Sequence, residues 1–497
     1  MFLTIDQGTT SSRALLFDEN CHVIDSCQKE FNQIYPDNGW VEHSPEEILS
    51  STLFCCEKIL ERNSERDIKS LGITNQRETI LVWDKSNGKP LYNAIVWQDR
   101  RTSIFCNNLK EDGLEGMINK KTGLLLDPYF SASKMSWLIK NIDGLKEKAS
   151  KGQVCFGTVD TWLIWNLTKG KVFATDVTNA SRTSLFNIEK IKWDDDLLKL
   201  FDIPIQSLPE VKNSNDLFGE SSLLSRSLKI TGVMGDQQSS AFGQFCYNEG
   251  DVKSTYGTGC FVLANTGDKI IYSEKKLLST IFYKIDNKIN YALEGSIFMA
   301  GGIMNWIKSN LGILNNISDS SKIASSVNPE SKVVLVPAFS GLGSPHWSSE
   351  SRGAIFGMSQ DTGKDELIHS SLQSISLQTL DLMNAIKSDF SQNNIELSSL
   401  LKVDGGMIEN QWFIQNLSSI CNYQIYKASM KESTALGTAL MSGIGVGFYS
   451  GVDDLQNFSI KRDQISPSMS SNLRNDIILN WNKAVKLTIE MAKQNNV

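Results

Sequence analysis

The sequence predicts an α/β protein with two halves, each built on a mixed sheet, and a ligand-binding cleft between them. Short apolar strands alternate with helical patterns in both halves, which is typical of layered α/β folds. A polar turn rich in glycine and threonine joins two strands near the start, and a second such turn follows about 250 residues later. The 497 residues allow more than one domain, so we expect halves 1–245 and 246–497. A cleft between two such halves is where a ligand is expected.

The composition is that of an ordinary globular protein and argues against nucleic acid as a partner. Hydrophobic residues make up 40% of the chain, which is enough for a large core. The net charge is -7, and no block of lysine and arginine stands out. Neutralisation of phosphates supplies most of the affinity of a nucleic-acid-binding protein, so a chain without a basic face is not expected to bind one.

Cysteine usage and the absence of long apolar runs predict a cytoplasmic protein. The nine cysteines are scattered and never form Cys-x-x-Cys, so we expect free thiols in a reducing compartment. The chain begins without a basic leader, and its first apolar run breaks at Asp6, which argues against a signal peptide. The uncharged stretch Ala435–Tyr449 falls short of the roughly 20 residues of a membrane helix, so we expect a buried helix of small residues and no transmembrane segment.

The first chemically informative segment is a predicted hairpin at the N-terminus. Phe2–Ile5 is an apolar strand, Gly8–Ser12 has the composition of a turn, and Arg13–Phe17 is the returning strand. The turn offers backbone N–H groups and hydroxyls to a phosphate, while Asp6 could bind Mg²⁺ and Arg13 could meet phosphate oxygens. The spacing alone fits a purely structural hairpin with a capping aspartate equally well.

The next elements are a helix and a strand that ends in polar residues. Ser44-Pro45-Glu46-Glu47 indicates a helix start, with a serine cap, a proline in the first turn and two acids. Ile68–Thr74 is a strand that runs into Asn75–Glu78. Polar side chains at the end of an apolar strand are candidates for a site.

The second half repeats the hairpin. Val252–Tyr256 and Cys260–Ala264 are strands around Gly257-Thr258-Gly259, which fits a second phosphate clamp. Another apolar strand, Leu400–Val403, ends in Asp404-Gly405-Gly406 and permits close approach of a ligand to the backbone. Three polar stretches are expected to be surface loops or elaborations within the domains: Gly219–Lys229, Asn315–Lys332 and Ser391–Ser399. Three dispersed turns of this kind describe the layout of actin-like ATPases, whereas the P-loop and protein-kinase motifs do not occur.

Longer blocks make the sequence similar to a known family. Asp6–Arg13 resembles the signature of the FGGY family of carbohydrate kinases. The blocks that resemble its glycerol-phosphorylating members are Asn75–Thr79 with Val82–Asp84, Ala94–Arg101, Pro128–Ser131, Gly235–Gln238, Ser254–Gly259, Phe298–Gly302 and Val403–Gly406. Because these blocks stand in the family's order along nearly the whole chain, we interpret the resemblance as homology.

The resemblance implies a fold, a reaction and a set of ligands. It implies two actin-like (ribonuclease H-like) domains whose cleft closes over ATP and glycerol. With ATP and Mg²⁺ as cofactors, the enzyme would transfer the γ-phosphate to a terminal hydroxyl of glycerol and release sn-glycerol 3-phosphate and ADP. We also expect a homo-oligomer, either a dimer or a tetramer.

The resemblance also implies roles for individual residues. The polyol would be bound by Arg77, Glu78, Trp97, Tyr129, Asp236, Gln237 and Phe261. ATP would be bound by Thr9, Thr10, Ser11, Arg13, Thr258, Gly301, Asn305, Gly406 and Asn410. Asp6 and Asp236 would lie at the metal, and Asp236 would be the general base, because phosphoryl transfer needs a proton acceptor beside the attacking hydroxyl. Asn305 replaces a glutamine that is common in the family and reaches less far.

One departure and two alternatives remain at this stage. Leu224–Lys229 lacks the glycine pair with which some family members bind a sugar bisphosphate inhibitor. A sister kinase acting on a pentose or a sugar acid would share the ATP half and differ around Arg77, Trp97 and Tyr129. A non-catalytic actin-like ATPase would keep the phosphate turns without a polyol pocket.

Overall fold

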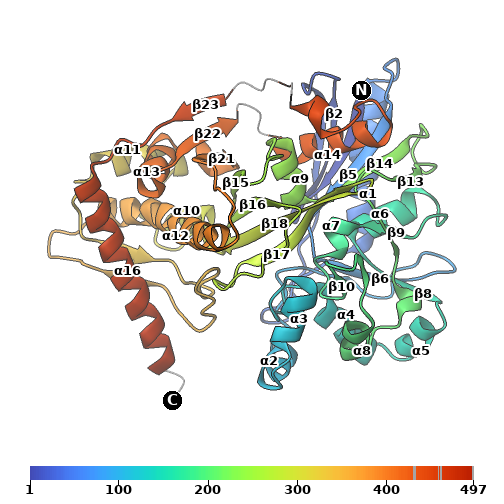
Figure 1. Ribbon diagram of the computed structural model, residues 1–497, viewed down its shortest axis with the longest axis horizontal. Helices are drawn as coiled ribbons and strands as arrows, with labels where there is room; N and C mark the ends of the chain where they lie inside the picture. Colours follow the sequence, from blue (N-terminus) through green and yellow to red (C-terminus); the bar gives the residue numbers. More distant parts are fainter. Residues whose placement is uncertain (429–431, 457, 459–461, 495–497) are drawn as a thin grey trace.

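The first half of the chain is built on a six-stranded mixed sheet (Figure 1). The computed structural model describes residues 1–428, 432–456, 458 and 462–494. Across the sheet the strands are β13 (Leu217–Glu220), β14 (Lys229–Gly235), β5 (Ser70–Asn75), β1 (Phe2–Gln7), β2 (Ser11–Phe17) and β3 (Val23–Glu30). Every residue of β1 and β5 is buried, which explains why both appear in the sequence as apolar runs.

A smaller sheet and several helices complete this half. The four-stranded sheet consists of β4 (Glu42–His43), β7 (Ala94–Ile95), β6 (Ile80–Asp84) and β8 (Val154–Thr158). The helices are α1 (Pro45–Arg62), α2 (Ser103–Glu111), α3 (Glu115–Thr122), α4 (Ser131–Asn141), α5 (Leu145–Ser150), α6 (Val159–Leu167), α7 (Val177–Ala180), α8 (Asp195–Phe201) and α9 (Asp236–Gly243). The predicted start of α1 is confirmed, because the Ser44 hydroxyl accepts the Glu47 N–H at 3.2 Å.

The second half is built on a seven-stranded mixed sheet. Its strands are β17 (Leu278–Ile285), β18 (Lys288–Ile297), β16 (Cys260–Gly267), β15 (Val252–Tyr256), β21 (Leu400–Asp404), β22 (Gln424–Ala428) and β23 (Arg462–Ile465). The helices are α10 (Gly301–Ser309), α11 (Ser320–Ser326), α12 (Lys364–Gln392), α13 (Gln411–Cys421), α14 (Ser433–Gly445), α15 (Val452–Leu455) and α16 (Ser471–Gln494). No helix of the described residues is long and apolar enough to cross a membrane.

The repeated hairpin predicted from the sequence is confirmed. β1 and β2 are antiparallel, and β5 pairs parallel to the other edge of β1. In the same way β15 and β16 are antiparallel, and β21 pairs parallel to β15. The two polar turns therefore occupy equivalent places in two sheets of related topology.

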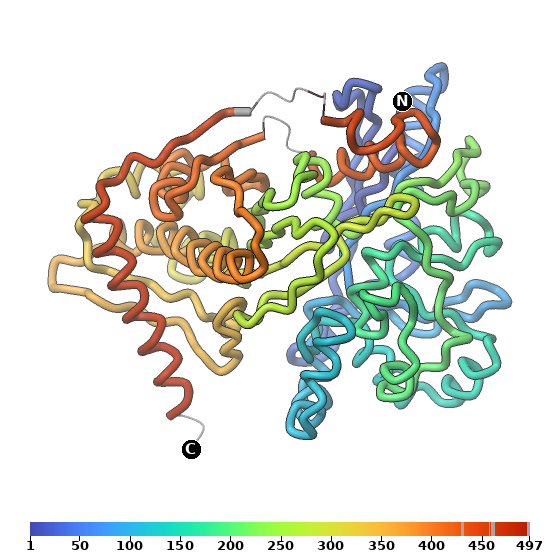
Figure 2. Tube along the Cα trace, in the orientation of Figure 1, coloured from blue at the N-terminus to red at the C-terminus, as the bar shows by residue number. Residues whose placement is uncertain are grey.

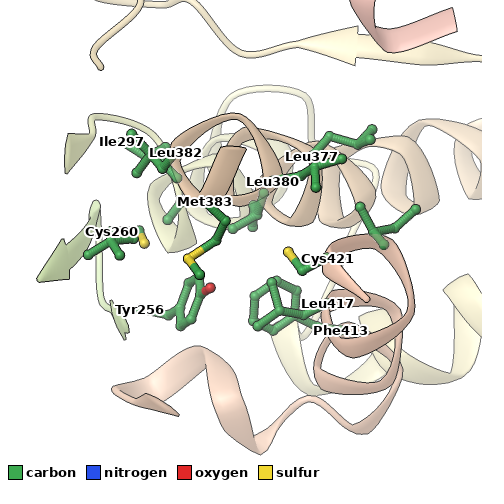
Figure 3. Close-up of a cluster of buried hydrophobic side chains, with 14 of the residues drawn as sticks. Tyr256, Cys260, Ile297, Leu377, Leu380, Leu382, Met383, Phe413, Leu417 and Cys421 are labelled. Carbon is green, nitrogen blue, oxygen red and sulfur yellow. The ribbon is translucent and has the colours of Figure 1, made fainter. Parts of the chain in front are cut away.

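The core of the second half lies between its sheet and the long helix α12. Figure 3 shows Tyr256 and Cys260 facing Met383 of α12, with Phe413 and Cys421 of α13 beside them. The rings of Tyr256 and Phe413 lie 5.2 Å apart in an edge-to-face arrangement. This packing fixes the strand that leads into the second polar turn.

One polar stretch expected to be a loop contains a helix. Within Asn315–Lys332, residues Ser320–Ser326 form α11, so this stretch is an elaboration with its own helix rather than a plain surface loop. Ser320 and Ala324 are buried, and α11 packs against α12 and α13. Tertiary packing has therefore overridden the weak helix propensity of a serine-rich segment.

One helix of the second half packs against the first half. The helix expected within Ala435–Tyr449 is α14, and it packs against α9, β14, β5 and β1. The crossing of α9 and α14 depends on glycine, because a Cβ on Gly437 would lie 1.8 Å from the carbonyl oxygen of Ser239. A Cβ on Gly243 would lie 2.0 Å from the carbonyl oxygen of Ser433. The two helix backbones therefore touch directly.

We expect Gly437→Ala to lower the free energy of unfolding by about 1–3 kcal/mol, because the added methyl group must push the helices apart. Urea denaturation would measure the loss. Gly116→Ala is the matched control, since Gly116 lies in α3 with no atom within 4 Å of the added methyl group. A Gly437→Ala protein as stable as the wild type would contradict the close crossing.

Candidate active site

The first polar turn is fixed by contacts with an aromatic side chain. The N–H of Gly8 donates to the carbonyl oxygen of Ser11 at 2.9 Å, which closes the turn between β1 and β2. The indole N–H of Trp97 donates to the Thr9 hydroxyl at 3.0 Å. Thr10 at the tip of the turn is exposed. Thr9, predicted to bind phosphate, and Trp97, predicted to bind the polyol, are thus in direct contact.

Arg13 lies beside this turn and is bound by two carboxylates. It stands opposite Asp6 in the β1–β2 pairing, and its guanidinium donates to the Asp6 carboxylate. A second guanidinium nitrogen donates to Glu432 Oε2 at 2.6 Å. Asp6 and then Glu432 raise the pKa of Arg13, so this arginine stays charged. The sequence did not indicate Glu432, which comes from the second half immediately before α14.

Three aromatic side chains predicted to line the polyol meet in the structure. The ring of Trp97 lies 5.6 Å from that of Tyr129 and 6.4 Å from that of Phe261, both edge-to-face. Trp97 and Tyr129 belong to the first half, whereas Phe261 lies on β16 of the second sheet. The two halves together form this aromatic wall.

Arg77 and Glu78 follow β5 in a tight turn. The N–H of Thr79 donates to the carbonyl oxygen of Arg77 at 2.7 Å, and Glu78 has a φ of +61°. A glutamate in the left-handed region is uncommon and persists where the surroundings enforce it. The Ser131 hydroxyl donates to the Glu78 carbonyl oxygen at 2.9 Å and anchors the turn. Both charged side chains are buried, as is typical of a binding site.

The guanidinium of Arg77 is bound on several sides. Its Nη1 and Nη2 donate to Glu294 at 2.6 Å and 3.0 Å. Nη1 also donates to Gln238 at 3.1 Å, and Nε lies 3.1 Å from Asp236 Oδ1. Burial alone would lower the pKa of Arg77, but Glu294 and Glu78 outweigh it and raise the pKa. Arg77 is therefore a permanent cation beside the candidate base.

Asp236 combines partial exposure with a raised pKa. It is the first residue of α9, directly after β14, where a carboxylate is stabilised by the helix dipole. A third of its side-chain surface remains exposed (32%). Burial raises the pKa of Asp236 to about 6, although Arg77 opposes the rise. At neutral pH the carboxylate is therefore ionised and poised to accept a proton.

Besides Glu432, four charged residues of the site were missed from the sequence: Arg182, Glu294, Lys253 and Lys134. Arg182 is fully buried and donates to Glu78 at 2.6 Å and to Glu294 at 2.9 Å. The Glu294 position carried a weak signal, because it is a lone carboxylate inside the otherwise uncharged strand segment 289–297. Arg182 had no pattern around it that could have indicated its role.

The two lysines position neighbours that the sequence did predict. Lys253 Nζ donates to Gln237 Oε1 at 2.7 Å, and burial lowers the pKa of this amine. Lys134 Nζ donates to the carbonyl oxygen of Tyr129 at 2.7 Å, and burial lowers its pKa to about 7. A buried amine is costly without hydrogen-bond partners, so each lysine holds the segment that it contacts in place.

The second polar turn lies against the N-terminus of α10. The carbonyl oxygen of Thr258 accepts the N–H groups of Ala300 and Gly302, and that of Gly257 accepts the N–H of Gly301, all at 2.9 Å. A side chain on Gly301 would collide with the Gly257 carbonyl oxygen at 2.6 Å. Thr258 and Gly301 are thus brought together as predicted residues of the ATP site.

The remaining predicted ATP residues have different surroundings. Gly405 has a φ of +95°, and a Cβ on Gly406 would meet open space. Asn410 caps α13, since its Oδ1 accepts the Phe413 N–H at 2.9 Å and its Nδ2 donates to Ser320 at 3.0 Å. Asn305 is exposed on α10. Contacts of these residues with a nucleotide stay a prediction.

The carboxylates fit a metal that arrives with phosphate ligands. Among the residues that the structure describes, no group of three or more His, Cys, Asp or Glu side chains could bind a metal by itself. Mg²⁺ commonly binds to proteins through one or two carboxylates and takes its other ligands from water and substrate phosphates. Asp6 at the end of β1 and Asp236 at the start of α9 could supply two such carboxylates.

Comparison with known families covers most of the chain. The model of the FGGY family of carbohydrate kinases, N-terminal domain, matches residues 1–243, and the C-terminal domain model matches residues 252–446. Glycerol kinase 1 of Clostridium tetani is 47% identical over 496 residues, 99% of each chain. The glycerol kinase of Sinorhizobium fredii is 46% identical over 494 residues, again 99% of each chain.

Solved structures agree with this result. A crystal structure of Plasmodium falciparum glycerol kinase with ADP superposes with a TM-score of 0.91 at 38% identity and covers 98% of both chains. A gluconate kinase of Lactobacillus acidophilus has a TM-score of 0.86 at 19% identity, covering 99% of this chain and 98% of its own, which shows the fold alone. The two-half α/β architecture predicted from the sequence is confirmed.

Proposed function

This chain belongs to the FGGY family of carbohydrate kinases, with its actin-like two-domain fold, and we propose that it phosphorylates glycerol with ATP. The products are sn-glycerol 3-phosphate and ADP. One observation carries the choice of a small polyol: the buried pair Arg77 and Glu78 lies next to Asp236. Arginine donates to hydroxyl oxygens, whereas carboxylates accept from hydroxyl groups, so the three side chains match a triol.

In the proposed reaction Asp236 removes the proton from the attacking hydroxyl. The hydroxyl oxygen then forms a bond to the γ-phosphorus while the bond from that phosphorus to the bridging oxygen of ADP breaks. Arg77 orients the polyol and stays charged throughout. Trp97, Tyr129 and Phe261 cover the carbon chain, and Gln237 contributes a further polar contact. Because the chemistry asks the protein mainly for alignment and charge balance, this arrangement is sufficient.

We further propose how ATP and Mg²⁺ are bound. The β- and γ-phosphates bind at Thr9, Thr10, Ser11 and Arg13, with Thr258 and Gly406 opposite, and the nucleoside binds at Gly301, Asn305 and Asn410. Mg²⁺ neutralises phosphate charge when bound, with Asp6 and Asp236 as its protein ligands. Support comes from the short hydroxyl-rich turn at Thr9 and from the free space at Gly406.

The organisation of the protein is also proposed. Residues 1–245 bind polyol and phosphate and 246–497 bind the nucleotide, in a homo-oligomer that is a dimer or tetramer. We place the protein in the cytoplasm, and the nine free cysteines support a reducing compartment.

We expect glycerol to be the best acceptor in a coupled assay of ADP release across glycerol, pentuloses and sugar acids with ATP and Mg²⁺. The sister sugar kinases are the main alternative, because the gluconate kinase structure shares the fold. A higher kcat/KM for a pentulose than for glycerol would refute the proposed substrate. If ATP is hydrolysed at a rate that no polyol changes, the result would instead favour an actin-like ATPase without a polyol substrate.

A further inference from the structure

An arm of the second sheet lies against the first half of the protein. β17 and β18 form an antiparallel hairpin that packs against α7 (Figure 1). Ile281 and Tyr291 of the hairpin share a core cluster with Val177 and Phe186, and the Tyr291 hydroxyl donates to the Ile188 carbonyl oxygen at 2.9 Å. Figure 2 shows this yellow-green segment running from the second half to the first. The arm is therefore a fixed connection between the halves.

The arm brings one carboxylate to the polyol site. Glu294 lies in β18, opposite Leu263 and Leu278 of the neighbouring strands, and its side chain is 1% exposed. Its two oxygens accept from Arg77 and Arg182 of the first half. Burial alone would raise the pKa of Glu294, but Arg182 and Arg77 lower it to about 2, so it remains an anion.

The contacts of Glu294 leave one edge of Arg77 for other partners. A guanidinium presents its N–H groups along fixed directions in one plane. Glu294 binds the edge formed by Nη1 and Nη2, and Gln238 accepts from Nη1. The remaining edge, formed by Nε and Nη2, has Asp236 at 3.1 Å from Nε. Glu294 therefore decides which edge of Arg77 faces the base.

Arg182 acts on Glu78 in a similar way. Its Nε donates to Glu78 Oε1 at 2.6 Å, while its Nη2 donates to Glu294 Oε1 at 2.9 Å. Arg182 therefore fixes the position of Oε1 of Glu78. Glu294 therefore orients Arg77 directly and Glu78 through Arg182.

We propose that Glu294 and Arg182 are positioning residues for polyol binding, through which the second half sets the orientation of Arg77 and Glu78. The inference rests on the proposed polyol kinase activity and adds two residues to its site. A purely structural ion pair would contribute to stability alone, because buried pairs are often replaceable without other effects.

The test is Glu294→Gln. The amide has one acceptor oxygen in place of two and no charge, so it cannot keep the contacts of both carboxylate oxygens. We therefore expect the glycerol KM and the glycerol Kd from calorimetry without nucleotide to rise about 10- to 100-fold. The ATP KM should change less than about threefold.

Two further variants keep the test decisive. Glu294→Asp retains the charge with a shorter reach, so its rise in glycerol KM should be smaller than that of Glu294→Gln. Glu42→Gln is the matched control, because Glu42 is a buried carboxylate 2.7 Å from the buried Arg101, outside the site. It should lose stability without a change in glycerol KM.

The outcomes separate this inference from the proposed function. If folded Glu294→Gln and Glu294→Asp both keep a wild-type glycerol KM, the positioning role is refuted. If the wild type prefers another sugar, the proposed function fails. The role of Glu294 is then tested by comparing the KM for that sugar between the Glu294 variants and the wild type. An equal rise in KM for Glu42→Gln would also refute the role, because any buried charge pair would then have the same effect.

Discussion

Asp236→Asn is expected to lower kcat by about 10²- to 10⁴-fold, the usual contribution of a general base. The amide keeps the size of the side chain and can still accept from Arg77 and from the Gln237 N–H, which donates to Asp236 at 2.7 Å. It cannot take the proton of the attacking hydroxyl. Glycerol binding should therefore weaken much less than kcat, which steady-state kinetics and calorimetry would measure separately.

The pH profile provides a second signature of this base. Burial raises the pKa of Asp236 to about 6, and only the ionised form accepts a proton. Wild-type kcat/KM should therefore be level above that pH and fall about tenfold per pH unit below it, a limb that Asp236→Asn should lack. Asp194→Asn is the matched control, because Asp194 likewise lies at the start of a helix, α8, and pairs with a cation, the amine of Lys121, at 2.6 Å. If Asp236→Asn keeps more than about a tenth of wild-type kcat, Asp236 is not the base.

Arg77→Ala is expected to reduce kcat/KM for glycerol roughly 100-fold or more. A charge-assisted hydrogen bond contributes about 1.5–3 kcal/mol, and here Glu294 and Asp236 also lose a partner. Removal of the Arg77 charge raises the pKa of Asp236 further, so the acid limb should move to higher pH.

The control for Arg77→Ala is Arg101→Ala. Arg101 is likewise buried and donates to two carboxylates, at 2.7 Å to Glu42 and 2.8 Å to Asp99. Both variants should lose stability, but only Arg77→Ala should lose glycerol binding, with the ATP KM nearly unchanged. A wild-type glycerol KM in Arg77→Ala would remove this residue from the site.

Much of the fold could be predicted because its signals are local. The buried strands β1 and β5, the cap at Ser44 and the two polar hairpins each depend on residues close together in the chain. The helix α11 was missed because its stability comes from packing against α12 and α13, which its own serine-rich sequence does not encode.

The candidate site was predictable only in part, for a related reason. Arg77, Glu78 and Asp236 stand in recognisable blocks, whereas Glu294 is a single charge in an apolar strand. Its partner Arg77 lies 217 positions away in the sequence. The role of such a carboxylate can be recognised only in the folded structure, where the arm places it between two arginines. Lys253 and Lys134 were missed in the same way, because a buried amine resembles a surface lysine in sequence.

The direct contact between α9 and α14 has a consequence for the order in which the protein is made. The first sheet is covered by α14, which is translated about 190 residues after the proposed boundary near residue 245. At about 5–20 residues per second, the emerging first half would wait on the order of 10–40 s for the helix that covers β14, β5 and β1. During this interval the face of the sheet that α14 later covers is exposed and must be kept from associating with other chains. The two halves are thus distinct in architecture but not in biogenesis, and a fragment that ends at residue 245 should depend on the remainder of the chain to complete its fold.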